Sequence, residues 1–155
     1  LLAPPMNSPP FRQSLYELVR CYQAFESYAN ANIRKIGLTT PQFDVLTTLS
    51  NAAVQQMTPK ELGEQTWITK GTLTGIIDRL EAKGLVERLP SAVDGRSQII
   101  TLTGKGKKLL DKIVPEHVAY MGRIFTGFTP DDYRAIETVL ENLRQRIHAQ
   151  EPDAK

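Results

Sequence analysis

Small polar residues and a lysine stand together where a helix over 69–83 is predicted to begin. They are Thr69, Lys70, Gly71, Thr72 and Thr74. Short hydroxyl groups allow close approach of a backbone and still form hydrogen bonds with phosphate oxygens or base edges. A helix with such an uncluttered first turn can enter the major groove of DNA. Thr69 is better explained as an N-cap, so Lys70, Thr72 and Thr74 are the stronger candidates.

A second candidate group lies at the tip of a predicted hairpin. Strands over 85–89 and 98–102 flank a polar tip at 90–97, which contains Arg96. A cation at such a tip can reach a neighbouring minor groove, and a narrow A·T-rich groove attracts it electrostatically. The alternative is an ordinary solvated hairpin cation.

Two more charged residues belong to the predicted helix over 69–83. Arg79 can contact a phosphate or pair with a glutamate along its own helix, and the sequence favours neither. Asp78 would be repelled by anionic DNA. We therefore expect Asp78 to hold an arginine of the hairpin, such as Arg88.

The helices that position these candidates begin at recognisable residues. Three Thr-Pro pairs each fit an N-cap followed by a proline in the first turn: Thr40-Pro41, Thr58-Pro59 and Thr129-Pro130. Glu61 completes a capping box with Thr58. Together with the apolar periodicity, these signals predict helices over 11–36, 41–51, 58–66, 69–83, 104–126 and 130–148.

Glycine, threonine and proline refine the helix ends. Gly37 and Gly84 are expected to end the helices before them, because glycine readily adopts the left-handed conformation found there. Thr103 can cap the helix over 104–126. Pro115 predicts a kink inside that helix.

The outer helices carry wide apolar faces that we expect to be buried. In the first helix they include Phe11, Leu15, Leu18, Val19, Tyr22, Phe25, Ala29, Ile33 and Ile36. In the last helix they are Tyr133, Ile136, Val139, Leu140, Leu143 and Ile147. A small domain has little central core for all of these faces, so a second copy of the chain is the expected cover. A monomeric helical bundle with a wing is the alternative.

Composition limits the function classes. The chain has 155 residues, 41% hydrophobic content, a net charge of +2 and one cysteine. No apolar stretch approaches the roughly 18 residues of a membrane span, and residues 1–10 are more typical of a Pro-rich leader than of a signal peptide. One cysteine allows no internal disulfide, which favours a cytoplasmic setting. Within 58–102, six basic residues balance six acidic ones, so only the placement of cations argues for nucleic acid.

The block from Thr58 to Leu102 resembles the MarR family (multiple antibiotic resistance regulators) of transcription factors. The matching segments are ELGEQTWITKGTLTGIIDRLEAKGLVER, the wing DGRSQIITLT and the following LTGKG, which fits the family's Leu-Thr-x-x-Gly turn into a long helix. The resemblance extends over the chain from residue 11, since the flanking long helices match the family's dimerisation region.

The resemblance implies a homodimer that binds a pseudo-palindromic operator in double-stranded DNA, usually as a repressor released by a small molecule or an oxidant. By position, Thr69, Lys70, Gly71, Thr72 and Thr74 match the recognition helix. Arg96 matches the wing arginine that enters the minor groove, and Asp94 is placed to orient it. The departures from the family pattern are Thr66, Trp67, Gly75 and Gly95. Gly75 and Gly95 stand where basic residues are common, which implies fewer phosphate contacts.

The family's effector pocket lies between the long helices and the winged region. The residues expected to line it here are Tyr22, Phe25, Phe43 and His117, with Tyr28 and Met121 as further candidates. We expect a small aromatic or amphipathic acid, which Arg20 or His117 could meet. Such a molecule would change the spacing of the two recognition helices through a hinge at Leu102-Thr103. Alternatively, these residues belong only to the core or the dimer interface.

Cys21 invites comparison with the peroxide-sensing branch of the family. A gap-free alignment on Pro41-Gln42 places that branch's reactive cysteine near Leu15, so we interpret Cys21 as a structural thiol among apolar neighbours. His117 and His148 with one cysteine supply too few ligands for a structural zinc site. We expect neither a metal nor a cofactor.

The sequence therefore predicts an α+β fold, mainly α. A winged helix-turn-helix at 41–102 follows a leader at 1–10 and is flanked by dimerisation helices at 11–36 and 104–148. We expect a DNA-binding transcriptional regulator and not an enzyme; a thiol peroxidase would need a resolving cysteine or a nearby base. A winged-helix module that binds proteins and not DNA stays as the alternative, because the charge of 58–102 is balanced.

Overall fold

The computed structural model describes residues 9–53, 55–66, 68–91 and 98–150. The chain divides after Tyr120 into two compact units, each described by itself. The first unit contains, in order, α1 (Pro10–Lys35), α2 (Thr40–Asn51), β1 (Gln56–Met57), α3 (Pro59–Thr66), α4 (Lys70–Ala82), β2 (Val86–Pro90), β3 (Gln98–Leu102) and most of α5 (Gly104–Gly122). The second contains the end of α5, the 3₁₀ turn η1 (Arg123–Phe125) and α6 (Pro130–His148).

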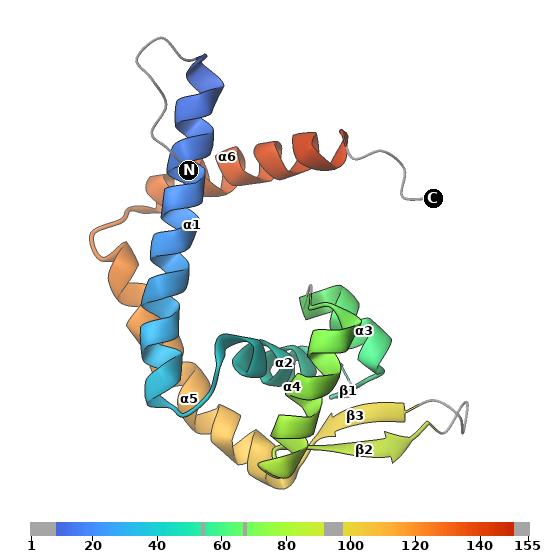
Figure 1. Ribbon diagram of the computed structural model, residues 1–155. Coiled ribbons are helices and arrows are strands. Elements are labelled where there is room, and N and C mark those ends of the chain that lie inside the picture. Colours follow the sequence, from blue (N-terminus) through green and yellow to red (C-terminus); the bar gives the residue numbers. More distant parts are fainter. Residues whose placement is uncertain (1–8, 54, 67, 92–97, 151–155) are drawn as a thin grey trace. The chain divides into compact units, whose positions relative to one another are not determined.

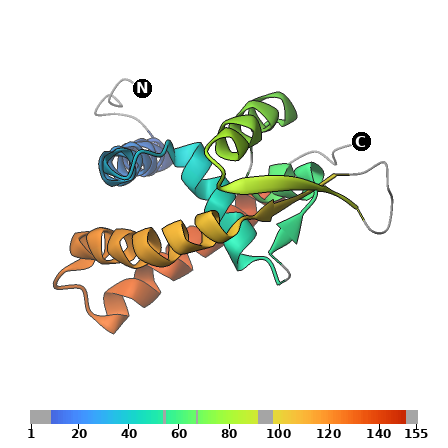
Figure 2. The same cartoon turned by 90° about the horizontal axis from the view of Figure 1, so that it is seen from below.

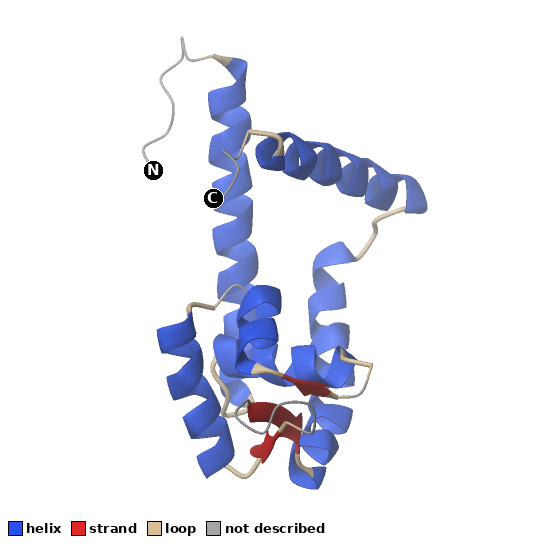
Figure 3. Cartoon of the chain, turned by 90° about the vertical axis from the view of Figure 1, so that its right-hand side faces the viewer, coloured by secondary structure: helices blue, strands red, loops and turns tan. Residues whose placement is uncertain are grey.

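The three strands form a small antiparallel sheet in the order β1-β3-β2. The β2–β3 hairpin pairs Val86 with Leu102 and Pro90 with Gln98, so it reaches one residue beyond the predicted end of the first strand. The sequence did not predict β1, a two-residue strand that pairs Gln56 with Thr101 (Figures 2 and 3). The observed order of helices and strands is that of a winged helix-turn-helix.

One apolar core joins the helices of the first unit to the sheet. α2 lies between α1 and the α3–α4 pair, as Figure 1 shows. The most completely buried side chains of this core are Ile33, Val45, Leu46, Leu49, Leu62, Leu73, Ile77, Leu80, Val86 and Ile100. Because residues of α2, α3, α4 and the hairpin share this core, the exposed face of α4 is held in a fixed orientation to the sheet.

The helix starts follow the capping chemistry, with one correction. Thr58 and Glu61 form the predicted capping box, in which the Glu61 carboxylate accepts from the Thr58 backbone N–H at 2.7 Å. The N-cap of α2, however, is Thr39 and not Thr40. The side chain of Gln42 accepts from the Thr39 backbone N–H at 3.1 Å, whereas the third residue after Thr40 is a phenylalanine, which cannot close a capping box.

The helix ends also match the predicted positions closely. Gly37 and Gly84 adopt φ angles of +78° and +68°, directly after α1 and α4. α5 contains Pro115 but ends at Gly122, where a 3₁₀ turn replaces the predicted last α-helical turn. Thr129 caps α6 through a capping box with Asp132.

The apolar faces of the outer helices are largely exposed in the single chain, and their burial against a second copy stays a prediction. In α1, Phe11, Leu15, Tyr22 and Phe25 are exposed, and only Ala29 and Ile33 are buried. In α6 the apolar residues are all exposed: they are Tyr133, Ile136, Val139, Leu140, Leu143 and Ile147. Periodicity correctly grouped each set on one helix face, but each unit alone does not cover that face.

Candidate nucleic-acid interface and effector pocket

α4 has one buried face and one polar face. Leu73, Ile76, Ile77 and Leu80 recur at helical spacing and lie in the core. The sequence-predicted residues all lie on the exposed side: they are Thr69, Lys70, Gly71, Thr72, Thr74 and Arg79. The fold therefore presents the candidate residues to solvent on one helix.

The threonines at the start of α4 form local hydrogen bonds. Thr69 occupies the N-cap position, but its side chain does not cap the helix; its hydroxyl instead donates to Thr72 Oγ1 at 3.0 Å. The Thr74 hydroxyl donates to the Lys70 carbonyl at 3.1 Å. Since the Thr72 oxygen accepts the bond from Thr69, the Thr72 hydrogen is available to donate to a phosphate or base acceptor.

Two glycines, Gly71 and Gly75, leave parts of the α4 surface without side chains. A Cβ atom at Gly71 or Gly75 would meet no other atom within 4 Å, leaving aside the chain neighbours and the helix's own backbone. Glycine in a helix interior costs roughly 0.5–1 kcal/mol relative to alanine. The packing of this chain therefore gives no reason for glycine at either position, whereas close approach of a partner would.

The hairpin is fastened to α4 by an ion-pair cluster. Arg88 of β2 pairs with Asp78 at 2.5 Å, which confirms the predicted contact, and also with Glu81, which was not predicted. Glu81 follows Asp78 by three residues and so lies on the same helix face, a signal that was available in the sequence. Arg79 forms no ion pair with a carboxylate among the described residues, so the alternative in which it pairs with a glutamate of its own helix is not found.

The wing tip lies outside the described residues. Asp94, Gly95 and Arg96 belong to 92–97, and Trp67 is likewise not described. The described strands end at Pro90 and begin again at Gln98, and they form the base of the hairpin that carries this segment.

The exit from the hairpin into α5 is closely bonded. The Thr103 hydroxyl donates to the Gly84 carbonyl at 2.7 Å and accepts from the Gly106 N–H at 3.0 Å. The Thr103 N–H donates to the Leu85 carbonyl at 3.1 Å. A Cβ on Gly106 would lie 2.1 Å from the Leu85 oxygen, which explains why the LTGKG segment ends in glycine.

The four predicted effector residues line one cavity of about 350 Å³ between α1, α2 and α5. They are Tyr22, Phe25, Phe43 and His117. The rings of Phe43 and His117 are 4.8 Å apart. Neither Tyr28 nor Arg20 lines this cavity: Tyr28 stacks on Tyr120, and Arg20 lies near Glu17 and over the ring of Tyr16.

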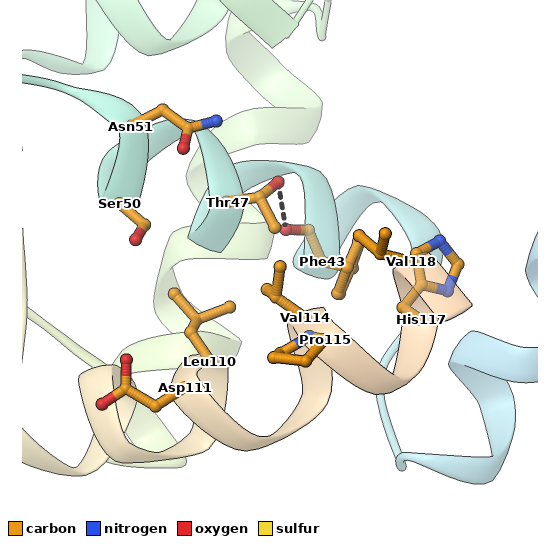
Figure 4. Close-up of a pocket in the computed structure, with 10 residues that line it drawn as sticks. All are labelled: Phe43, Thr47, Ser50, Asn51, Leu110, Asp111, Val114, Pro115, His117 and Val118. Carbon is orange, nitrogen blue, oxygen red and sulfur yellow. Dashed lines mark hydrogen bonds between the residues drawn. The ribbon is translucent and has the colours of Figure 1, made fainter. Parts of the chain in front are cut away.

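A second cavity, of about 510 Å³, lies on the other side of Phe43 and His117, between α2 and α5. Figure 4 shows Thr47, Ser50 and Asn51 of α2 across from Leu110 and Val114 of α5. The Thr47 hydroxyl donates to the Phe43 carbonyl at 3.0 Å, a hydrogen bond within α2. Phe43 and His117 border both cavities.

Burial shifts the pKa values of two side chains that line the first cavity, His117 and Asp44. Desolvation lowers the pKa of His117 below its ordinary value, which favours the neutral ring at neutral pH. His117 Nδ1 lies 2.8 Å from the Asn32 side-chain oxygen, an acceptor, so Nδ1 carries the proton and Nε2 is left as an acceptor. Asp44 is exposed on one side, yet enough protein surrounds its carboxyl to raise its pKa.

Cys21 is exposed in the single chain, as are its neighbours Arg20 and Tyr22 on α1. Its interpretation as a structural thiol stays a prediction. Among the described residues, no group of three or more His, Cys, Asp or Glu is placed to hold a metal ion. No described helix is long and apolar enough to cross a membrane.

Comparison with known proteins agrees with this geometry. The sequence model of the MarR family matches residues 36–97. The HTH-type transcriptional regulator YkoM of Bacillus subtilis, which is uncharacterised, is 32% identical over 83% of this chain and 82% of its own. Sco3205 of Streptomyces coelicolor, a MarR family regulator solved in complex with DNA, superposes with a TM-score of 0.82 at 21% identity over 97% of each chain.

A third relative is BpsR of Bordetella bronchiseptica, whose DNA binding is regulated by 6-hydroxynicotinic acid. It superposes with a TM-score of 0.75 at 27% identity, over 92% of this chain and 98% of its own. The winged helix-turn-helix, the family match and these relatives lead to one conclusion: the chain belongs to the MarR family of DNA-binding transcriptional regulators and is not an enzyme.

Proposed function

We propose that the protein is a homodimeric repressor that binds a pseudo-palindromic operator and is released by a small-molecule effector. The observation that carries the proposal is the exposed polar face of α4, a helix whose other face is buried in the core. α4 enters the major groove, and an operator covered in this way is closed to the transcription machinery.

The candidate residues of α4 and of the wing have separate roles in this proposal. Lys70 and Arg79 neutralise phosphates, and Thr72 donates a hydrogen bond, supported from behind by the Thr69 hydroxyl. Gly71 lets the DNA backbone come close to the helix. Arg96 enters the adjacent minor groove, with Asp94 orienting it; this part of the proposal rests on the sequence.

The exposed apolar residues of α1 and α6 support the proposed dimer. Val139 is 64% exposed and Ile147 is 51% exposed in the single chain, on a helix that contributes no residue to the buried core. A two-fold dimer covers such faces and places two recognition helices about 34–36 Å apart, one turn of B-DNA. Leu143→Asp should therefore yield monomers in sedimentation at micromolar concentration and should weaken operator binding. A dimer that persists would contradict this part of the proposal.

The effector occupies the cavity formed by Tyr22, Phe25, Phe43 and His117. The cavity lies between α1, α2 and α5 and away from the exposed face of α4. Occupancy can therefore change the spacing of the two recognition helices without contact to DNA. A difference in effector affinity of about 1–3 kcal/mol between the free and the DNA-bound dimer is sufficient for regulation.

The experiment selects an operator from a random duplex pool with the wild-type protein and then measures its affinity for two variants over a range of salt. Lys70→Ala should lower affinity and reduce the slope of log K against log salt by about one, because one phosphate contact is lost. Thr72→Val keeps the shape of threonine but removes the donor, so it should weaken binding while leaving the salt slope unchanged. Lys112→Ala, an exposed lysine of α5, is the control.

The competing function is a winged-helix module that binds proteins and not DNA. If no duplex is selected, or if Lys70→Ala and Thr72→Val both bind like the wild type, the face of α4 is not the DNA interface.

A further inference from the structure

The charged residues of the cavity between α1, α2 and α5 favour a ligand of opposite charge to the acid expected from the sequence. Two carboxylates, Glu26 of α1 and Asp44 of α2, line the same cavity as the predicted aromatic residues. No lysine or arginine is among the residues that line it. Within the described part of the chain, no cation pairs with either carboxylate within 4.0 Å. An anionic ligand would therefore meet two carboxylates, neither of which is in an ion pair with a described cation.

The rest of the cavity also suits a positive ligand. The rings of Tyr22, Phe25 and Phe43 border it, and the face of an aromatic ring attracts an organic cation. His117 offers an acceptor at Nε2, because its Nδ1–H is engaged by the side-chain oxygen of Asn32. The hydroxyl of Thr40 donates to the Asn30 side chain and so is not a free donor for a carboxylate ligand.

We infer that the cavity between α1, α2 and α5 binds a lipophilic organic cation, a protonated amine attached to an aromatic body, with Glu26 and Asp44 facing its charge and Tyr22, Phe25 and Phe43 holding its apolar part. The inference rests on the proposed function in taking this cavity as the effector site. Its volume of about 350 Å³ suits a one- or two-ring molecule.

Both carboxylates lie where an ammonium group at the rim of the cavity could reach them. Glu26 and Asp44 both belong to the exposed residues, although partial burial of the Asp44 carboxyl raises its pKa. An ammonium group at the rim keeps part of its own hydration and gains two carboxylate neighbours. A carboxylate ligand at the same place would gain none of these contacts and would meet repulsion from both.

The test compares three molecules of nearly equal shape: phenethylammonium, 3-phenylpropionate and the neutral 2-phenylethanol. Calorimetry with the full-length wild-type protein should give the order cation, neutral, anion, with the cation at least about tenfold tighter than the anion. Tighter binding of 3-phenylpropionate, or no detectable binding of phenethylammonium at millimolar concentration, would overturn the inference.

Variants locate the charge preference. Glu26→Gln combined with Asp44→Asn should reduce the cation-to-anion ratio to near one while leaving the affinity for 2-phenylethanol unchanged. Glu17→Gln, on the same helix but near Arg20 and outside the cavity, is the control and should keep the wild-type ratio. An unchanged ratio in the double variant would show that the cation binds elsewhere and would refute the assignment.

The operator assay separates this inference from the proposed function. If phenethylammonium binds with the expected charge preference but leaves operator affinity unchanged, the cavity binds cations and the proposed effector coupling is wrong. If an acid releases the operator and the amine does not bind, the coupling stands and the cation assignment is wrong.

Discussion

Gly106→Ala tests whether the junction between the hairpin and α5 is rigid. An added Cβ would lie 2.1 Å from the Leu85 oxygen, 3.1 Å from the Leu85 carbonyl carbon and 3.3 Å from Leu102 Cδ2. Two of these neighbours are backbone atoms, and the Leu85 carbonyl also accepts the hydrogen bond from the Thr103 N–H. The clash therefore cannot be relieved by turning a side chain, and the backbone must separate.

The cost follows from three contributions. Overpacking of this kind costs about 1–3 kcal/mol, and weakening of the Thr103–Leu85 hydrogen bond adds roughly 0.5–1.5 kcal/mol. The higher helix propensity of alanine returns about 1 kcal/mol. The net loss of unfolding free energy is about 1–3 kcal/mol, which for a chain of this size lowers the melting temperature by roughly 2–4 °C per kcal/mol.

The chain offers a matched control two residues earlier. A Cβ at Gly104 meets nothing within 4 Å, so Gly104→Ala should leave stability unchanged or raise it by up to about 1 kcal/mol. Both variants are melted at one protein concentration, because association shifts the transition. If Gly106→Ala is as stable as Gly104→Ala, the junction yields easily and the inference of a rigid connection is refuted.

Arg88→Ala should lower the free energy of unfolding in urea by about 1–2 kcal/mol, because it leaves two carboxylates of α4 close together without their cation. Lys60→Ala, which breaks an exposed ion pair, is the control and should lower it by about 0.5 kcal/mol or less. Equal losses would contradict a stabilising role for the Arg88 ion pairs. Hydrogen bonds from the capping threonines lower the pKa values of Glu61 and Asp132 in the folded protein. The two ionised carboxylates therefore stabilise the fold above their ordinary pKa values of 4.5 and 3.8, and this stabilisation is lost as the pH falls through the lower pKa values of the folded state. Glu61→Gln should therefore flatten the decline of the urea midpoint below about pH 5, and an unchanged decline would count against the capping box as its source. Gly71→Ala should raise the melting temperature, since the added Cβ meets nothing within 4 Å and alanine stabilises the helix by about 0.5–1 kcal/mol. The same variant should weaken operator binding. Unchanged binding would show that DNA does not approach this glycine closely.

Local chemistry in the sequence was sufficient for most of the fold. The Thr58 and Thr129 N-caps and the two left-handed glycines after α1 and α4 depend on residues within four positions of one another. The choice of Thr39 over Thr40 was open to the same reasoning, because only Thr39 has a glutamine three residues later. β1 was not accessible in this way, since two residues become a strand only through pairing with distant Thr101 and Ile100.

The candidate sites also contain residues that local sequence patterns predict and residues that they do not. The exposed residues of α4 follow from the apolar period of the helix, and the Asp78–Arg88 pair follows from charge. The four aromatic and histidine residues of the cavity were grouped by the resemblance alone. The carboxylate of Glu26 was overlooked, although it follows Tyr22 by four residues and precedes Ala29 by three and so shares their helix face.

The rigid junction changes how an effector can act on α4. The sequence predicts a hinge at Leu102-Thr103, but Thr103 forms hydrogen bonds with both Gly84 and Leu85, which follow the end of α4. α4, the hairpin and the start of α5 are therefore joined by short hydrogen bonds and should move as one body. Phe43 offers the remaining route, because it borders the cavity and belongs to the core that α2 shares with α4. We expect a ligand that displaces Phe43 to shift α2, and with it the body that carries the proposed DNA-binding face.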